Sequence, residues 1–314
     1  MATPSSADDN HPPSLSTLLK KDGFIIIPSL LTPSELTTLR AAASKLTALS
    51  RAGAWPHIRT VGKQFPPWPS SPSPSGIWGI QHLLHPSLPL PQADRQAFQN
   101  LYFSPRILSI ASQLLLAPAP GTEDNGKEDV LVMELCNMLV RPSTPFALRW
   151  HRDDIPWSAS AVDEEARLDI TKPIHHTQWN LALYDDDSLI VVPGSHARAR
   201  TQAERSADPF ADDMPGQIKV QLTAGDVAFY DNNILHRGVY DSAKERMTLH
   251  GSVGHVDGSR ERARNVLQHG VGEWVEQCDF GGLEEGVRER AEGMRERLVR
   301  MGRENGDVGF SLSE

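Results

Sequence analysis

The chain has 314 residues, a net charge of −9 and a pI of about 5.7. An acidic chain lacks the basic stripe that nucleic-acid binding requires, so we expect a small-molecule partner and no nucleic acid. Two cysteines, Cys136 and Cys278, exclude a disulfide framework and a four-thiolate zinc site. No apolar stretch reaches membrane-spanning length and the first residues have no signal-peptide core, so we predict a cytoplasmic protein without a membrane partner.

The first half of the chain contains the helical signals. Thr32 and Glu35 have the spacing of a capping box, and Pro33 occupies the first helical position, which predicts a helix from Pro33 to about Leu49. Composition predicts the other segments: a disordered leader at 1–14, a strand at 22–28, an irregular loop at 63–76, a helical region at 91–116 and a surface loop at 118–128.

From about Asp129 to His255 the chain breaks into short runs of β-forming residues between turn signals. We predict strands near 130–141, 147–152, 177–185, 188–192, 217–223, 226–231, 236–240 and 246–254. Short strands with such regular punctuation indicate a barrel or a jelly roll. The fold class is therefore mostly β with flanking helices.

Two insertions and a charged tail complete the organisation. Segments 154–176 and 197–216 are candidates for lids over a site. Apolar residues recur every three or four positions in 282–303, which predicts a helix that packs its apolar stripe on the core; a dimerisation helix is the alternative. We divide the chain into the leader 1–14, a β-rich domain with an N-terminal helical region at 15–260, and a C-terminal helical extension at 261–314.

The most informative stretch is Trp150-His151-Arg152-Asp153. Residues two apart on a strand point to the same side, so His151 and Asp153 can supply two ligands of one metal site. His236, which follows a strand that begins after Gly225, is the best third ligand. Two histidines and one carboxylate form a triad that binds iron(II) on one face and leaves positions open for a 2-oxo acid and dioxygen. Zinc would bind the same ligands but lacks the redox chemistry.

An arginine follows the distal histidine by ten residues. Arg246 lies in an alternating, strand-like run, where its guanidinium can pair with the distal carboxylate of 2-oxoglutarate. Thr248 points the same way and can add a hydroxyl donor. The alternative for Arg246 is a surface ion pair with Glu245 or Asp241.

The remaining histidines are expected to be packed or solvated rather than ligands. His250 shares a strand face with Arg246 and is the strongest exception. The others considered are His175, His176, His196 and His255.

The order and spacing of several motifs resemble the phytanoyl-CoA dioxygenase family of iron(II)/2-oxoglutarate oxygenases. The resemblance covers roughly residues 18–255. It rests on Lys21 to Pro28 with Leu31 to Leu36, Trp150 to Asp153, Leu181 to Asp186 with Val191 to His196, Thr223 to Val227, and Leu235 to Gly238.

This resemblance implies a double-stranded β-helix, the jelly-roll, cupin-like core, with His151, Asp153 and His236 as metal ligands. It implies Arg246 as the 2-oxoglutarate arginine. It adds three residues near the cosubstrate: Arg141, Gln178 and Asn180.

The expected function is an iron(II)- and 2-oxoglutarate-dependent dioxygenase that uses O2 to oxidise a C–H bond of a small organic metabolite, as in secondary metabolism, and releases succinate. The carboxylate of Asp153 favours oxygenation over chlorination, because a halogenase of this kind has a small residue there. Two alternatives stay open: a cupin-like metalloprotein that does not use 2-oxoglutarate, and a non-catalytic ligand-binding member of the fold. Succinate formation separates the first from the expected enzyme.

Substrate contacts are less specific. Four aromatic residues are candidates for an apolar pocket, with ordinary core packing as the alternative: Trp78, Phe146, Trp157 and Trp179. Three arginines can either bind an anionic substrate or neutralise nearby acidic residues: Arg149, Arg152 and Arg237.

Overall fold

The computed structural model describes residues 13–68, 76–115, 130–168 and 171–309. The helices are α1 Leu15–Asp22, α2 Pro33–Arg51, α3 Gln92–Tyr102, α4 Pro105–Leu115, α5 Ala161–Arg167, α6 Gln202–Ser206, α7 Arg260–Gln268 and α8 Glu285–Arg303. The strands are β1 Phe24–Ile27, β2 Ile58–Thr60, β3 Ile77–Ile80, β4 Leu131–Val140, β5 Phe146–Ala147, β6 His176–Ala182, β7 Leu189–Val191, β8 Ile218–Lys219, β9 Val227–Tyr230, β10 His236–Tyr240 and β11 Met247–His255.

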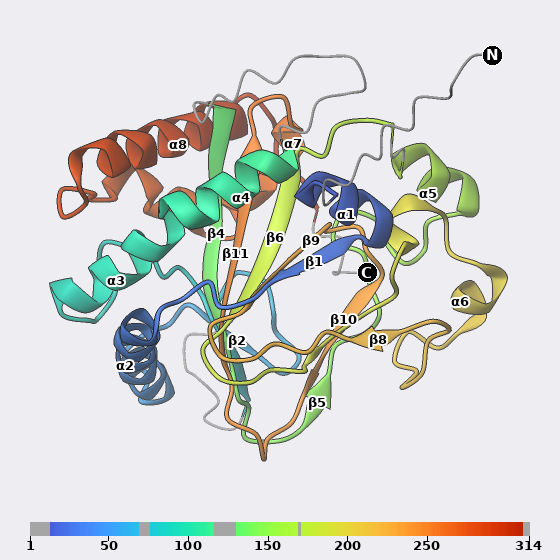
Figure 1. The fold of residues 1–314 in the computed structure, drawn as a ribbon, viewed down its shortest axis with the longest axis horizontal. Coiled ribbons are helices and arrows are strands. Elements are labelled where there is room, and N and C mark those ends of the chain that lie inside the picture. The colour runs from blue at the N-terminus through green and yellow to red at the C-terminus, as the bar shows by residue number, and fades with distance from the viewer. Residues whose placement is uncertain (1–12, 69–75, 116–129, 169–170, 310–314) are drawn as a thin grey trace, which may run out of the picture.

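The strands form two antiparallel sheets. The larger has seven strands in the order β1-β9-β6-β11-β4-β3-β2, and the smaller has four in the order β5-β10-β7-β8. Neighbours in the sheets are often far apart in sequence: β11 lies between β4 and β6, and β1 pairs with β9. Figure 1 shows α3, α4 and α8 against the large sheet, with β5, β8 and β10 on the other side. The predicted β-rich fold with flanking helices is confirmed.

The two faces of the large sheet differ because side chains alternate along each strand. On β6, Trp179 and Leu181 enter the hydrophobic core on the helix-covered face, whereas Gln178 and Asn180 line a cavity on the opposite face. On β11, Leu249 likewise enters that core. The polar residues of these strands are therefore directed toward the small sheet.

Local sequence signals explain the helix boundaries. Thr32 caps α2, and Glu35 completes the capping box, as predicted. The predicted helical region at 91–116 is two helices, because Pro105 begins α4 and has no backbone N–H to continue α3. The predicted C-terminal helix is α8, which packs against β4 and α7 through the buried face that includes Met294 and Leu298.

Some predicted elements were wrong. The segment 147–152 is not a strand: β5 ends at Ala147, and the rest of the segment is irregular apart from one bridge at His151. The backbone bends at Trp150, whose N–H donates to the Pro209 carbonyl at 2.7 Å rather than to a neighbouring strand. The insertion 154–176 contains α5. The helix α7 falls in the predicted C-terminal helical extension but had no predicted range of its own, and α1, β2 and β3 were not predicted.

Several predictions lie wholly or partly outside the described residues. These are the disordered leader at 1–14, of which 13–14 are described, the loop at 118–128, and part of the loop at 63–76. In the part of the chain that the structure describes, no helix combines the length and apolar character needed to cross a bilayer.

Candidate metal centre and cosubstrate cavity

Two short segments bring the predicted metal ligands together. His236 begins β10, and His151 lies opposite it in an antiparallel bridge, with both backbone N–H groups donating to the partner carbonyl at 3.0 Å. Asp153 follows two residues later, and its backbone N–H donates to the Asn232 carbonyl at 2.9 Å. Residues 85 positions apart are therefore fixed side by side by backbone pairing rather than by a long strand.

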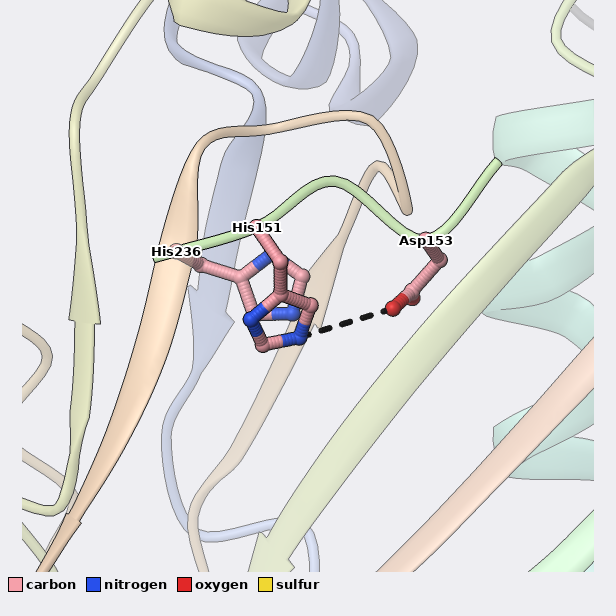
Figure 2. A group of neighbouring side chains, drawn as sticks. All are labelled: His151, Asp153 and His236. Atoms are coloured by element: carbon pink, nitrogen blue, oxygen red, sulfur yellow. Dashed lines mark ion pairs between the residues drawn. The ribbon is translucent and has the colours of Figure 1, made fainter. Parts of the chain in front are cut away.

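The three side chains converge on one point. One ligand atom from each of His151, Asp153 and His236 lies within 4.8 Å of the others. The Nε2 atom of His151 is 3.6 Å from Oδ1 of Asp153, and the centroids of the two imidazole rings are 4.3 Å apart. Figure 2 shows the two rings side by side, facing the Asp153 carboxylate.

Backbone carbonyls set the tautomer of both histidines. Nδ1 of His151 donates to the Arg149 carbonyl at 2.7 Å, and Nδ1 of His236 donates to the Ile234 carbonyl at 2.8 Å. Each Nε2 atom is thus left as a lone-pair donor, which is the usual arrangement of metal-binding imidazoles. Burial, followed by the charge of His236, lowers the pKa of His151 to about 4, so this ring is neutral at pH 7.

Asp153 is held in its charged form. Burial opposes ionisation, but the neighbouring imidazoles and the Arg262 guanidinium keep the pKa of Asp153 below its ordinary value. The Gln178 side-chain amide donates to Oδ2 of Asp153 and fixes the orientation of the carboxylate. Two imidazole nitrogens and one oriented carboxylate are a donor set that fits iron(II).

The three predicted metal ligands open into a cavity of about 120 Å³ between the two sheets. Apolar side chains from both sheets form part of its wall, including Leu135, Leu139 and Leu189. Polar and aromatic lining residues include Arg59, Gln64, Gln178, Asn180, Tyr230, Tyr240, Arg246, His250, Arg262, Asn265 and His269. The site thus offers a set of possible metal ligands beside a mixed polar and apolar space.

Arg246 lines this cavity and is almost completely buried. Its Nε donates to Asp186 at 3.0 Å and lies 3.3 Å from the Thr248 hydroxyl, and its guanidinium lies over the Tyr240 ring at 4.4 Å. The side-chain partner is therefore Asp186 rather than Glu245 or Asp241. The buried Nη1 has no hydrogen-bond partner, so the arginine keeps a donor for an anion.

Of the other predicted cosubstrate residues, two line the cavity and two do not. Gln178 and Asn180 line the cavity, and Asn180 accepts from Nδ1 of His250 at 2.8 Å. Thr248 is fully buried and donates to Asp186. Arg141 is not among the cavity-lining residues: its guanidinium is 3.5 Å from Glu245, and its side chain is 35% exposed.

Of the additional histidines, His250 lines the metal cavity. The other four, His175, His176, His196 and His255, line a second cavity on the far side of Arg262. The expectation that these four are not metal ligands agrees with this placement. His250 shares the Arg246 face of β11, as the alternation predicted.

Among the candidate substrate contacts, only Trp78 lines the cavity. Phe146 packs behind it against Tyr240, with ring centroids 4.5 Å apart. Trp179 lies in the core under the helices, and Trp157 lies against Arg200. Of the three arginines, Arg152 donates to the carbonyls of Ser195, Arg198 and Asn233, Arg237 donates to those of Phe210 and Ala211, and neither these two nor Arg149 lines the cavity.

Sequence reasoning missed several cavity residues. Arg59 comes from the three-residue strand β2, and Arg262 and His269 come from α7 and its end, which were not predicted as part of the site. Tyr230 carries a partial signal, because it is the last residue of β9, the strand that precedes His236. Arg59 carries no comparable signal, since its position depends on the pairing of β2 with β3.

The comparisons with known proteins agree with this geometry. A family model described as phytanoyl-CoA dioxygenase (PhyH) matches residues 19–248. No curated protein matches the chain. Among solved structures, EctD from S. alaskensis with 2-oxoglutarate and 5-hydroxyectoine is 17% identical, with a TM-score of 0.53 over 80% of this chain and 79% of that one. AviO1 from Streptomyces viridochromogenes Tue57 is 16% identical, with a TM-score of 0.51 over 75% of this chain and 91% of that one. At these identities the likeness establishes the fold, and it confirms the predicted jelly-roll core.

Proposed function

The chain belongs to the phytanoyl-CoA dioxygenase family of non-haem iron, 2-oxoglutarate-dependent enzymes, and from that premise we propose that it oxidises a C–H bond of a small organic substrate while 2-oxoglutarate is converted to succinate. One observation carries the proposal. The only group of His, Cys, Asp and Glu side chains in the described residues with metal-binding geometry opens into the cavity that Arg246 also lines.

His151, Asp153 and His236 would hold the iron. Bound iron(II) supplies the redox chemistry that couples reduction of O2 to decarboxylation of the 2-oxo acid and oxidation of the substrate. The protein's part is to keep both Nε2 atoms free and the carboxylate charged. The Nδ1 contacts of the histidines and the amide of Gln178 support that role.

Arg246 would orient the cosubstrate. Its Nε is engaged by Asp186, which prevents rotation of the guanidinium, while Nη1 remains available to a carboxylate. Asp186 also supports the charged state: although burial opposes it, the Asp186 carboxylate keeps the pKa of Arg246 above its ordinary value. The apolar part of the wall lowers the local dielectric constant, which strengthens the pairing of the arginine with an anion.

The reaction is proposed to be a hydroxylation, a desaturation or a related C–H oxidation. The retained carboxylate at Asp153 supports oxygenation over chlorination, because it occupies the ligand position that a halide would need. Retention of a complete triad also supports an enzyme over a non-catalytic binding protein.

Product analysis tests this proposal. The iron-loaded protein is incubated with a metabolite extract and ¹⁸O₂, with and without 2-oxoglutarate, and the products and succinate are identified by mass spectrometry. We expect a 2-oxoglutarate-dependent product that has gained one oxygen atom or lost two hydrogens, in step with succinate. A product formed equally well without 2-oxoglutarate would instead favour the cupin-like alternative.

A further inference from the structure

Arg59 enters the metal cavity from the edge of the large sheet. It is the middle residue of β2 and pairs with Gly79 of β3. A Cβ at Gly79 would lie 3.2 Å from both Cβ and Cδ of Arg59, so the absence of a side chain there leaves room for the arginine stem. The guanidinium lies 5.5 Å from the Trp78 ring centroid, and both residues line the cavity.

The charge of Arg59 is not balanced by the protein. Three arginines line the cavity, and two of them face a buried carboxylate at 3.0 Å: Arg246 pairs with Asp186, and Arg262 pairs with Glu134. Among the described residues, Arg59 forms no hydrogen bond or ion pair, and its Nε is shielded from solvent. Arg59 is half-buried, and a partly desolvated guanidinium without an anion is unfavourable, so the site is built for an anion that a ligand brings.

The nearby phenols cannot supply that anion. Burial raises the pKa of both Tyr230 and Tyr240, so both remain neutral at pH 7. Burial and then the charge of Arg59 lower the pKa of His250 to about 3, so this ring adds no charge of either sign. Asp153, the remaining acidic group of the cavity, belongs to the metal site.

The cosubstrate does not need Arg59. If the proposed function holds, one carboxylate of 2-oxoglutarate binds beside the metal and the other faces Arg246, whose Nη1 is free to receive it. Apolar side chains, including Trp78 and Leu139, line part of the cavity that Arg59 shares with the metal ligands. An anion recognised there would carry an apolar body.

We propose that Arg59 binds the carboxylate of the organic substrate, and that the substrate is therefore a small organic acid with an apolar body. This inference rests on the proposed function, since it assigns the second partner of the same cavity. Arg59 is then the residue that selects the acid over its neutral analogues, because a guanidinium pairs with a carboxylate through two parallel hydrogen bonds and an amide offers no matching charge.

Binding to the anaerobic iron(II)·2-oxoglutarate complex tests the assignment. Isothermal titration calorimetry compares a panel of aromatic and aliphatic carboxylic acids, each beside its primary amide, for the wild type, Arg59→Met and Arg303→Met. Arg303 is an exposed arginine of α8 and serves as the matched control. We expect acids to bind about tenfold or more tighter than their amides in the wild type and in Arg303→Met, and this preference to disappear in Arg59→Met.

Two further measurements on the same proteins distinguish substrate binding by Arg59 from a structural role and from cosubstrate binding. The affinity for 2-oxoglutarate should be unchanged in Arg59→Met, and its melting temperature without ligands should be equal to or above that of the wild type. A lower melting temperature would make Arg59 structural, and about tenfold weaker 2-oxoglutarate binding would assign it to the cosubstrate. If the wild type binds iron and 2-oxoglutarate but shows no preference for acids over amides, the assignment of Arg59 is overturned and the proposed function is unaffected. A wild type that binds neither would instead overturn the proposed function.

Discussion

The ion pair between Asp186 and Arg246 allows a sharp test of how the cavity is built. Both side chains are 6% exposed, and Nε of Arg246 lies 3.0 Å from Oδ2 of Asp186. At that distance, and with an effective dielectric constant of about 20, the attraction is about 5 kcal/mol before desolvation is counted. Removing one partner of such a pair leaves a buried charge and typically costs about 3–5 kcal/mol. We therefore expect Asp186→Ala to lower the free energy of unfolding by that amount.

The neighbouring residue provides the control. Asp187 faces Lys244 at 2.9 Å, a similar distance, but both side chains are exposed, so solvent screens the pair. Thermal unfolding is followed by circular dichroism. An unfolding entropy of about 2.1 cal/mol/K per residue converts the expected loss for Asp186→Ala into a drop of about 5–8 °C in Tm, whereas Asp187→Ala should melt close to the wild type.

A double variant distinguishes the loss of the Asp186–Arg246 ion pair from a general disruption of the site. Asp186→Ala combined with Arg246→Met should recover part of the lost stability, because the stranded guanidinium is then removed as well. If Asp186→Ala has the same Tm as the Asp187→Ala control, the Asp186–Arg246 pair does not stabilise the fold as a buried ion pair. If the double variant is less stable than Asp186→Ala by the full cost of a second lesion, the two side chains act independently.

Three further predictions concern the metal shell, acid stability and packing. Gln178→Leu, which removes the amide that orients Asp153, should weaken iron(II) binding about 10- to 100-fold in an anaerobic titration without lowering Tm; unchanged affinity would contradict this role. Glu134 is buried beside a guanidinium that keeps its pKa at about 2, against an ordinary 4.5, so it contributes about 3 kcal/mol of stability above pH 4.5 that is lost as the pH falls toward 2. Urea unfolding of Glu134→Gln should therefore show a flatter loss of stability between pH 4.5 and 2 than the wild type, and parallel curves would refute this. Gly251→Ala would place a Cβ against the Trp179 indole and should lower the free energy of unfolding by about 1–3 kcal/mol in the same assay. Gly286→Ala, with no atom within 4 Å of the new Cβ, should not lower it. Equal stability of the two variants would show that the Trp179 side chain moves aside without cost.

The convergence of His151, Asp153 and His236 could be predicted because the motif of the first two is local in sequence. His151 and Asp153 were placed on one face by the period of a strand, yet the structure has no strand there, and the backbone bridge to His236 brings them together instead. The prediction gave the right neighbours through a different local geometry. Arg246, immediately before β11, and His250 within it followed the predicted alternation, because β11 pairs in unbroken register with β4 and β6 from Thr248 to Gly251.

The second half of the cavity could not be predicted in the same way. Asp186 pairs with Arg246 across 60 positions, and this contact depends on where the chain turns after β6. Arg59 reaches the cavity because β2 joins the sheet edge through β3, which itself pairs with β4. A three-residue strand leaves too little pattern in the sequence to specify either its existence or its partner.

The most direct test of the proposed function is decarboxylation of labelled 2-oxoglutarate by the iron-loaded protein with a metabolite pool. Wild type, Asp153→Ala and Asp187→Ala are compared at equal protein and iron(II) concentrations. We predict release of labelled carbon dioxide by the wild type and by the exposed control Asp187→Ala, and loss of this release in Asp153→Ala. Iron-bound wild type that releases no carbon dioxide, or Asp153→Ala that releases as much as the wild type, would contradict the assignment of His151, Asp153 and His236 as the centre of an oxygenase.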